Sequence, residues 1–381
     1  MKSLNKILLT AIAAIVAAGI FASCKKDDGG GTPVIHYVRI TSPASSDSLL
    51  VSAGQGQLIA IMGENLGATV QVWFNDQKAT LTPTFITNTS ILVSVPSQIP
   101  MEITNKIKLI FKNGDSLLYD FTVDIGKPVV SSADCEYVPE GSSLVIHGTY
   151  FYAPVTVSFT GGAVGEVTEI SDDNDIITVT VPSGVQPGPV TVTTNFGSTE
   201  SDFWFDDTRN IFISSDPYEG WWNSSYVVYE PASTDPPKIN GNYIRVTMQM
   251  SSWSWNEIAG GPASSMPIQC KNIPDDAILH PEDYYFKFEI NTIKPYDGST
   301  LRINAALNAG DNDNYQWAPP YDSEGEWKTV VIPWEDMVAS YTTKPVINPD
   351  GYWCRILMQG AAELDCDICF DNFRIVPKVN Q

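Results

Sequence analysis

The sequence predicts an all-β chain in which two similar sandwiches precede a third, larger one. From Pro33 to about Phe205 it consists of short runs rich in Val, Ile and Thr, separated by turn residues and without a helical period. This pattern is typical of antiparallel sandwiches. Beyond Asp206 the strand pattern continues, and eight of the ten tryptophans lie there. The last part of the chain is therefore a domain of a different kind.

An internal repeat divides the first part into two copies. The segment GENLGATVQVWF at 63–74 aligns with GTYFYAPVTVSF at 148–159, and ILVSVPS at 91–97 aligns with ITVTVPS at 177–183 at nearly the same offset. Two copies of one unit therefore follow each other. We place the first copy at residues 33–125, the second at 126–206 and the tryptophan-rich domain at 207–381.

The N-terminus has the layout of a secretory signal. Two lysines precede an apolar run at 7–21, which is too short for a comfortable membrane span, and small residues precede Cys24. We interpret residues 1–23 as a signal peptide and 24–32, which is rich in glycine, as a flexible tether. An ordinary cleaved signal with a chance cysteine is the alternative.

The net charge of −22 repels phosphate backbones and anionic membrane surfaces. Nucleic acid is therefore excluded as a partner, and a neutral ligand is favoured. Five cysteines remain after Cys24, and Cys366 and Cys369 lie in a strand-like run, where residues three apart face opposite sides. We interpret them as buried or cross-strand cysteines, and we expect no metal and no cofactor.

The segment from Asn314 to Trp334 supplies the first candidate site residues. Tyr315, Trp317 and Tyr321 lie around Pro319 and Pro320, which lack amide donors and cannot join a ladder. We therefore expect this loop at the surface, with its rings uncovered. A sugar ring has a flat C–H face that packs on an aromatic face, so these rings predict a carbohydrate ligand.

Other candidates come from the surrounding strands and turns. Trp253 and Trp255 share a face if the chain is extended there, and the serines beside them indicate a loop edge. Trp353 follows a turn and opens a strand, which is a rim position. In the strand 301–307, alternate residues face the core and leave Arg302 and Asn304 on the other face, where they suit hydrogen bonds to hydroxyls. A solvated strand face or core packing is the alternative for each.

Catalytic motifs are not evident. The three histidines fall in separate segments, and the chain has no nucleophile elbow, HExxH or P-loop motif. A glycosidase needs two carboxyls across the scissile bond. Acidic candidates such as Glu257, Asp313, Glu335 and Asp336 lack a recognisable setting. We therefore expect no enzyme, although sequence alone gives no geometry for carboxylate pairs.

Several segments resemble known families. The Gly before the turn, the V-x-F strand and the V-P strand end of both repeats resemble IPT/TIG immunoglobulin-like domains. Cys24 resembles the lipobox cysteine of bacterial lipoproteins, with Phe21 where Leu is usual, and the following Lys-Lys-Asp-Asp resembles the export signal of Bacteroidetes surface lipoproteins. This resemblance implies lipidation of Cys24 and a place on the exterior of the outer membrane.

The whole layout resembles the surface glycan-binding lipoproteins of Bacteroidetes polysaccharide-utilisation loci, at the SGBP-B or SusE/F-like position. Likenesses in the last domain include Gly220-Trp-Trp, Trp253-Ser-Trp255, Trp317-Ala-Pro and Phe370-Asp-Asn-Phe-Arg374. The resemblance implies two tandem Ig-like sandwiches, as stiff spacers, before a jelly-roll sandwich of the carbohydrate-binding-module type.

The function implied is non-catalytic capture of a neutral polysaccharide. The family suggests a β-glucan, with β-1,3- or mixed-linkage glucan ahead of xyloglucan, and a TonB-dependent transporter with a SusD-like protein as partners of a monomer. Two alternatives stay open at this point. One is a surface endo-glycanase, and the other is an adhesin that uses its Ig-like domains on a protein.

Overall fold

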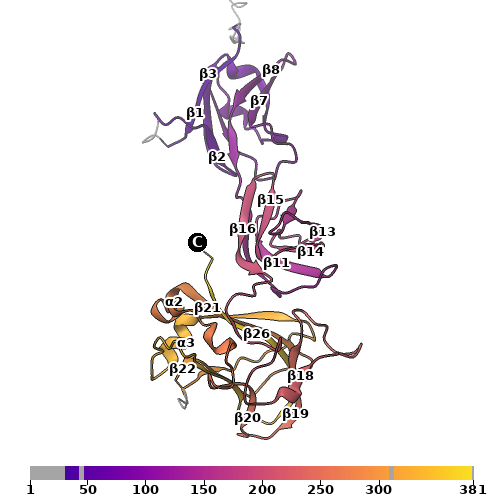
Figure 1. The fold of residues 1–381 in the computed structure, drawn as a ribbon. Coiled ribbons are helices and arrows are strands. Elements are labelled where there is room, and N and C mark those ends of the chain that lie inside the picture. The colour runs from indigo at the N-terminus through magenta and orange to yellow at the C-terminus, as the bar shows by residue number, and fades with distance from the viewer. Residues whose placement is uncertain (1–30, 43–46, 309–312, 380–381) are drawn as a thin grey trace, which may run out of the picture. The chain divides into compact units, whose positions relative to one another are not determined.

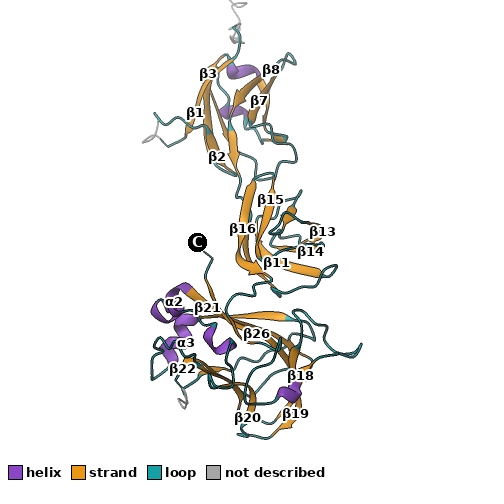
Figure 2. Cartoon of the chain, viewed as in Figure 1, coloured by secondary structure: helices purple, strands orange, loops and turns teal. Residues whose placement is uncertain are grey.

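The computed structural model describes residues 31–42, 47–308 and 313–379 (Figure 1). Strands make up most of the regular structure, and helices are few and short (Figure 2), so the all-β prediction is confirmed. The chain falls into two compact units, Met1–Gly126 and Lys127–Gln381. Cys24 and the expected signal peptide lie outside the described residues. Within the described ranges, no helix is long and apolar enough to cross a membrane.

The first unit is a small sandwich around one core. Its sheets have the orders β1-β3-β6 and β5-β4-β7-β8, with a short parallel pair β2-β9. Alternate residues of β3, β4 and β7 point inward and fill the core. The elements are β1 (Val34–Ile40), β2 (Ser52–Gly54), β3 (Leu58–Glu64), η2 (Leu66–Ala68), β4 (Thr69–Phe74), β5 (Gln77–Lys78), η3 (Pro83–Phe85), β6 (Ser90–Ser94), β7 (Lys106–Phe111), β8 (Ser116–Asp120) and β9 (Thr122–Asp124).

The second unit begins with a sheet of order β10-β11-β14-β13-β12-β15-β16. Its strands are β10 (Val129–Ala133), β11 (Ser143–Thr149), β12 (Thr156–Ser158), β13 (Val164–Ile170), β14 (Ile176–Thr180), β15 (Gly188–Thr194) and β16 (Gly197–Phe205). The repeat seen in the sequence has a structural counterpart here. A Cβ added at Gly63 would lie 2.0 Å from the Val34 carbonyl oxygen, and one added at Gly148 would lie 1.9 Å from that of Val129. Both copies thus need glycine for the same close strand contact.

Two sheets enclose the core of the tryptophan-rich part. One has the order β18-β19-β26-β21-β24, with β17 also paired to β26, and the other has the order β20-β25-β22-β23. The elements are β17 (Ile211–Ile213), η4 (Ser224–Tyr226), β18 (Val227–Val228), β19 (Tyr243–Met250), β20 (Asn256–Gly261), η5 (Gln269–Lys271), α2 (Asp275–Leu279), η6 (Pro281–Asp283), β21 (Tyr284–Thr292), β22 (Leu301–Leu307), β23 (Tyr315–Trp317), β24 (Lys328–Pro333), α3 (Trp334–Ser340), β25 (Trp353–Met358) and β26 (Leu364–Pro377).

A buried ion network crosses the predicted boundary at residue 206 inside the second unit. Glu136, which follows β10, lies 2.6 Å from Lys287 Nζ on β21 and 2.8 Å from Arg374 Nη2 on β26. Arg374 also lies 2.7 Å from Glu289, and all four side chains are buried. Because removing one partner of a buried pair leaves an uncompensated charge, these contacts bind the two parts together. The second Ig-like copy thus packs closely on the tryptophan-rich sandwich. Its separation as a domain of its own stays a prediction.

The cysteines of the described residues are buried and unpaired. They are Cys135, Cys270, Cys354, Cys366 and Cys369. Cys366 and Cys369 lie on β26 opposite two residues of β19, so their expected burial is confirmed. Burial raises the pKa of the Cys366 thiol to about 12, which keeps it protonated at neutral pH.

Candidate functional site

Trp317, the centre of the predicted site, lies in the core of the tryptophan-rich sandwich. It ends β23, which pairs with β22 so that Trp317 is opposite Leu301. Residues directly opposite each other in a ladder share a face, and Leu301 faces the core. The Trp317 ring packs 5.7 Å from that of Phe288 and 5.5 Å from that of Tyr296, and only 8% of the residue is exposed. The expected exposure of Trp317 is wrong.

The Pro-rich segment after β23 is fastened to the same core. Pro319 and Pro320 come just after the end of β23, as expected for residues that have no amide N–H to donate to a ladder. They do not place the rings of Tyr315, Trp317 and Tyr321 in solvent. Tyr321 and Tyr296 form a bridge in which each backbone N–H donates to the other carbonyl, at 2.8 and 2.7 Å. Tyr315 and Tyr321 are half-buried against the core, and burial raises the pKa of both phenols. Neither ring is fully uncovered.

Strand β22 alternates as predicted from Leu301 to Asn304, with Leu301 and Ile303 facing the core. The ladder register shifts between Asn304 and Leu307, so Leu307 lies opposite Trp353. Ala306, expected on the polar face, is buried in the core cluster, so the prediction is wrong for the end of the strand. Arg302 and Asn304 lie on the opposite side, which we call the outer face of the β20-β25-β22-β23 sheet. Arg302 is half-buried. Asn304 is fully buried, because its amide donates to the Asp313 backbone carbonyl and its Oδ1 accepts from Arg355 Nε at 3.3 Å. The expected exposure of Asn304 is therefore wrong.

Three indoles meet at the start of β25. The rings of Trp221, Trp222 and Trp353 lie 5.7–5.8 Å apart in edge-to-face pairs. Trp353 lies underneath with 7% of its surface exposed, whereas Trp221 is 60% exposed. The backbone N–H of Trp221 donates to the Gly260 carbonyl at 2.9 Å, which ties this loop to β20. Trp353 is therefore a support for the neighbouring rings, and its expected uncovered rim position is wrong.

Trp253 and Trp255 are the predicted site residues that are exposed. They lie on the loop before β20, as the serines beside them indicated, and are 61% and 53% exposed. The backbone N–H of Trp253 donates to the Gly360 carbonyl at 2.7 Å. The indole N–H of Trp255 donates to Glu257 Oε1 at 2.7 Å. The ring of Trp255 and the backbone of Trp253 are thus held by defined contacts, while much of the surface of both residues faces solvent.

Arg355 lies between the two exposed groups of rings. It is on β25, opposite Gly260 of β20 and Asn304 of β22. Its guanidinium carbon is 5.2 Å from the ring centroid of Trp255 and 5.8 Å from that of Trp353, which are cation–π distances. Burial lowers the pKa of this guanidinium, and the Glu257 carboxylate opposes that effect.

We call Trp221, Trp222, Trp253, Trp255 and Trp353 the aromatic face. The indoles supply flat apolar surface. The half-buried Arg302 and Glu257, both opposite Leu357 in the ladders, supply hydrogen-bonding groups on the outer face of the same sheet. Such a combination stacks on a C–H face and pairs with hydroxyls.

Sequence reasoning missed four of these residues. Neighbouring residues point to opposite sides of an extended chain, so the sequence does not decide which of Trp221 and Trp222 is exposed. Arg355 is two positions after Trp353 in a strand, so alternation alone indicates that the two share a face. Glu257 was considered only as a catalytic acid.

Three of the four acidic residues considered for hydrolysis are engaged in other contacts. Glu257 accepts from the Trp255 indole, Glu335 pairs with Lys378 Nζ at 3.1 Å, and Asp313 Oδ2 accepts from the Thr343 backbone N–H at 2.8 Å. These contacts fix the three carboxylates locally.

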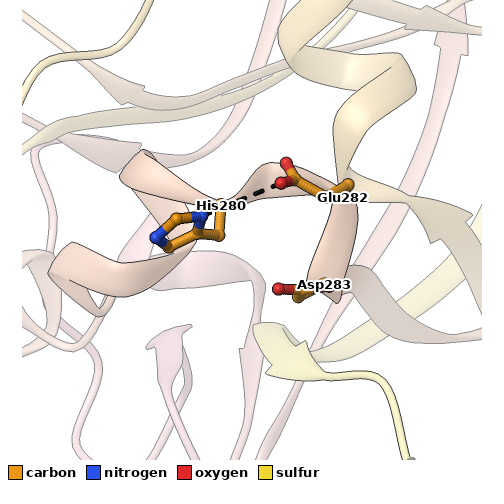
Figure 3. A group of neighbouring side chains, drawn as sticks. All are labelled: His280, Glu282 and Asp283. Carbon is orange, nitrogen blue, oxygen red and sulfur yellow. Dashed lines mark ion pairs between the residues drawn. The ribbon is translucent and has the colours of Figure 1, made fainter.

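A separate cluster lies around η6. Figure 3 shows His280, Glu282 and Asp283, whose ligand atoms lie within 4.8 Å of one another. His280 Nδ1 is 3.7 Å from Glu282 Oε1. All three side chains are exposed, and exposed acidic groups at such spacing are common without an ion. We assign no metal to this group.

Two parts of the chain match known family models. Residues 205–377 match the family model described as the surface glycan-binding protein B xyloglucan binding domain. Residues 45–123 match the IPT/TIG domain model. The first match spans both sheets that carry and support the aromatic face.

Individual relatives cover almost the whole chain. An IPT/TIG domain-containing protein of Bacteroides ovatus is 22% identical over 93% of this chain and 95% of its own length. The crystal structure of surface glycan-binding protein PbSGBP-B from Prevotella bryantii has a TM-score of 0.67 and 24% identity, covering 92% of this chain and 99% of that one. SGBP-B from a complex xyloglucan utilisation locus in Bacteroides uniformis has a TM-score of 0.50 and 18% identity, covering 91% and 100%.

At these identities, the two solved structures show a common fold. The family matches go further and confirm the resemblance on which the sequence reading rested. Residues 205–377 are thus similar to the surface glycan-binding protein B domain whose model they match, and residues 45–123 are similar to IPT/TIG domains.

Proposed function

We propose that the chain is a non-catalytic lipoprotein that captures a neutral polysaccharide outside the cell. In this proposal, acyl groups on Cys24 anchor the protein to the outer membrane, facing the exterior. The aromatic face binds the polysaccharide and holds it for surface enzymes and for a TonB-dependent importer with its SusD-like partner.

The observation that carries the proposal is the exposure of Trp221, Trp253 and Trp255. Large apolar side chains that stay exposed together mark binding surfaces more often than isolated ones do. Trp255 and Trp221 contact side chains of β25, namely Arg355 and Trp353, so the sandwich holds these two indoles in place. Two side-chain torsions per ring also limit the entropy lost on binding.

A β-glucan is the proposed ligand class. The net charge of −22 disfavours anionic polysaccharides such as uronates, and equatorially linked glucose chains offer flat C–H faces to an indole. The description of the matching family names xyloglucan, which supports placing xyloglucan beside mixed-linkage and β-1,3-glucan as first ligands to test.

We expect modest affinity at a single site. Each aromatic stack contributes about 1 kcal/mol beyond the area that it buries, and hydroxyls must give up water on binding. A long polymer offers many equivalent segments to many anchored copies, so avidity raises retention without any new contact.

The test is affinity electrophoresis of the purified protein in native gels that contain xyloglucan, mixed-linkage glucan, β-1,3-glucan or a uronate polymer. We expect slowed migration in at least one neutral glucan and none in the uronate gel. Unchanged migration in every neutral glucan would contradict the proposal and favour a protein-binding adhesin.

A parallel incubation with the same glucans tests the non-catalytic part. We expect no new reducing ends over many hours at enzyme-like protein concentrations. Sustained release of reducing ends that disappears in a Glu257→Gln variant would instead identify a surface endo-glycanase.

A further inference from the structure

Arg355 is a buried cation whose contacts are chiefly to aromatic rings. Its side chain is 6% exposed, and its Nη1 lies 3.8 Å from Glu257 Oε1. By contrast, Arg374 and Arg245 of the same unit lie 2.7–2.8 Å from two carboxylates each. Burying a charge is costly unless close partners compensate it. The loose ion pair of Arg355 therefore does not account for its position.

The first ring that Arg355 contacts is exposed. Trp255 has the Arg355 guanidinium 5.2 Å from its centroid, and its N–H donates to Glu257 Oε1 at 2.7 Å. One contact restrains the plane of the indole and the other restrains its rotation within that plane. The remaining surface of the ring is free for a ligand.

The second ring that Arg355 contacts leads to the other exposed group. Trp353 lies 5.8 Å from the guanidinium, and the Trp221 and Trp222 rings each lie 5.7 Å from Trp353. Arg355 and Trp353 thus connect two separate exposed parts of the aromatic face. One part precedes β20 and the other precedes β18.

The guanidinium is itself held in place from the neighbouring strand. Arg355 Nε donates to Asn304 Oδ1 at 3.3 Å, and the Asn304 amide donates to the Asp313 backbone carbonyl. Because Asn304 is fully buried, it fixes the guanidinium without competition from water.

We propose that Arg355 is a positioning residue that holds the Trp255 part and the Trp221 part of the aromatic face at a fixed spacing. This inference rests on the proposed glycan-binding function and deepens it. A glycan long enough to reach both parts gains from rings that are already in place, because preorganisation removes an ordering cost from binding. A short oligosaccharide that reaches one part gains little.

The test compares Arg355→Met and Arg355→Lys with the unaltered full-length mature protein. Dissociation constants are measured by calorimetry for a series of oligosaccharides, from two to eight sugars, cut from the glucan that slows the protein in gels. We expect Arg355→Met to weaken binding of the longest oligosaccharide roughly tenfold, in line with loss of cation–π support at two rings, and to change binding of the shortest by less than about twofold. Arg355→Lys keeps a cation but lacks the planar guanidinium. Its affinity for the longest oligosaccharide is expected to lie between those of Arg355→Met and the unaltered protein.

Arg245→Met is the matched control. Arg245 is a half-buried arginine on β19 of the other sheet, paired with Asp235 and Asp367. Arg245→Met should lower the melting temperature, and any change in the dissociation constant should be the same for short and long oligosaccharides. If Arg355→Met shows the same pattern as this control, Arg355 has a purely structural role and the inference is overturned.

A measurement without ligand separates the inference from the proposed function. Acrylamide quenching and near-ultraviolet circular dichroism report ring mobility, and Arg355→Met should increase quenching and reduce the tryptophan band. If no glucan binds but these signals change, the proposed function fails while the positioning role stands. Unchanged signals and unchanged length dependence would overturn the positioning role alone. If Arg355→Met does not fold, Glu257→Ala releases the Trp255 N–H and is expected to give the same length dependence.

Discussion

Trp317 and Trp255 have similar sequence settings and opposite structural ones. Each ends an aromatic-x-Trp triplet, Tyr315-Gln-Trp317 and Trp253-Ser-Trp255. The triplet beside the prolines lies in the core, with Trp317 8% exposed, whereas Trp255 beside the serines is 53% exposed. The difference teaches that the ladder register opposite Leu301 places Trp317 in the core, whatever the composition of the loop that follows it.

The neighbours of the two rings differ in kind. Trp317 is surrounded by the aromatic rings of Phe288, Tyr296 and Tyr321, which is how a core residue packs. Trp255 is restrained by the carboxylate of Glu257 and the guanidinium of Arg355. Aromatic neighbours close around a ring, whereas the two ionic groups hold Trp255 and leave much of it uncovered.

Trp317→Ala should give the largest effect, and it should be an effect on stability. Removing a buried indole leaves a cavity, and such changes cost about 3–5 kcal/mol. Urea unfolding followed by fluorescence measures the loss. Binding measured well below the unfolding midpoint should be nearly unchanged. A loss of glucan binding without a loss of stability would show that Trp317 is a binding residue and would contradict the contrast with Trp255.

Trp255→Ala should give the next largest effect, and it should be an effect on binding. Losing one stacking ring is expected to weaken retention roughly tenfold, which corresponds to about 1.4 kcal/mol. The free energy of unfolding should change by less than about 1 kcal/mol, as at other exposed positions. Trp255→Phe keeps a ring without the N–H and serves as the control, with an intermediate affinity expected. Equal losses of stability in Trp255→Ala and Trp317→Ala would remove the distinction drawn here.

Trp253→Ala should give the smallest effect. The Trp253 backbone is fixed by hydrogen bonds to Gly360 and Gln359, while its ring is more exposed than that of Trp255. A ring that is less restrained pays more entropy on binding, so a loss of about threefold in affinity is expected. Affinity electrophoresis in the glucan-containing native gels measures this loss. A loss larger than that of Trp255→Ala would show that Trp253 is the main stacking ring.

Much of the fold followed from local patterns. The alternation of β22 placed Leu301 and Ile303 in the core, and the aligned Gly63 and Gly148 make the same close strand contact in both repeats. The two family matches confirm the resemblance drawn from short motifs. These features depend on residues near each other in the sequence, which a single sequence displays directly.

The candidate site was harder to predict from the sequence, because its contacts join segments that are far apart in the chain. Nothing local shows that Asp313 covers Asn304, or that Trp317 is opposite Leu301 across a ladder. Arg355 is 100 residues from Trp255 in the sequence, and only the pairing of β20 with β25 brings them together. The tryptophan composition therefore indicates the candidate domain, whereas strand register determines which of its indoles are exposed.

The ion network around Glu136 has a consequence for how this architecture can be recombined. Beside it, Cys135 and Tyr137 pack on Tyr243, Trp327 and Cys369 in one apolar cluster. A fusion protein that contained residues 207–381 alone would expose this apolar cluster and leave Lys287 without the carboxylate of Glu136. Exposed apolar surface of this kind favours aggregation. An exchangeable module that keeps these contacts intact therefore starts near residue 127.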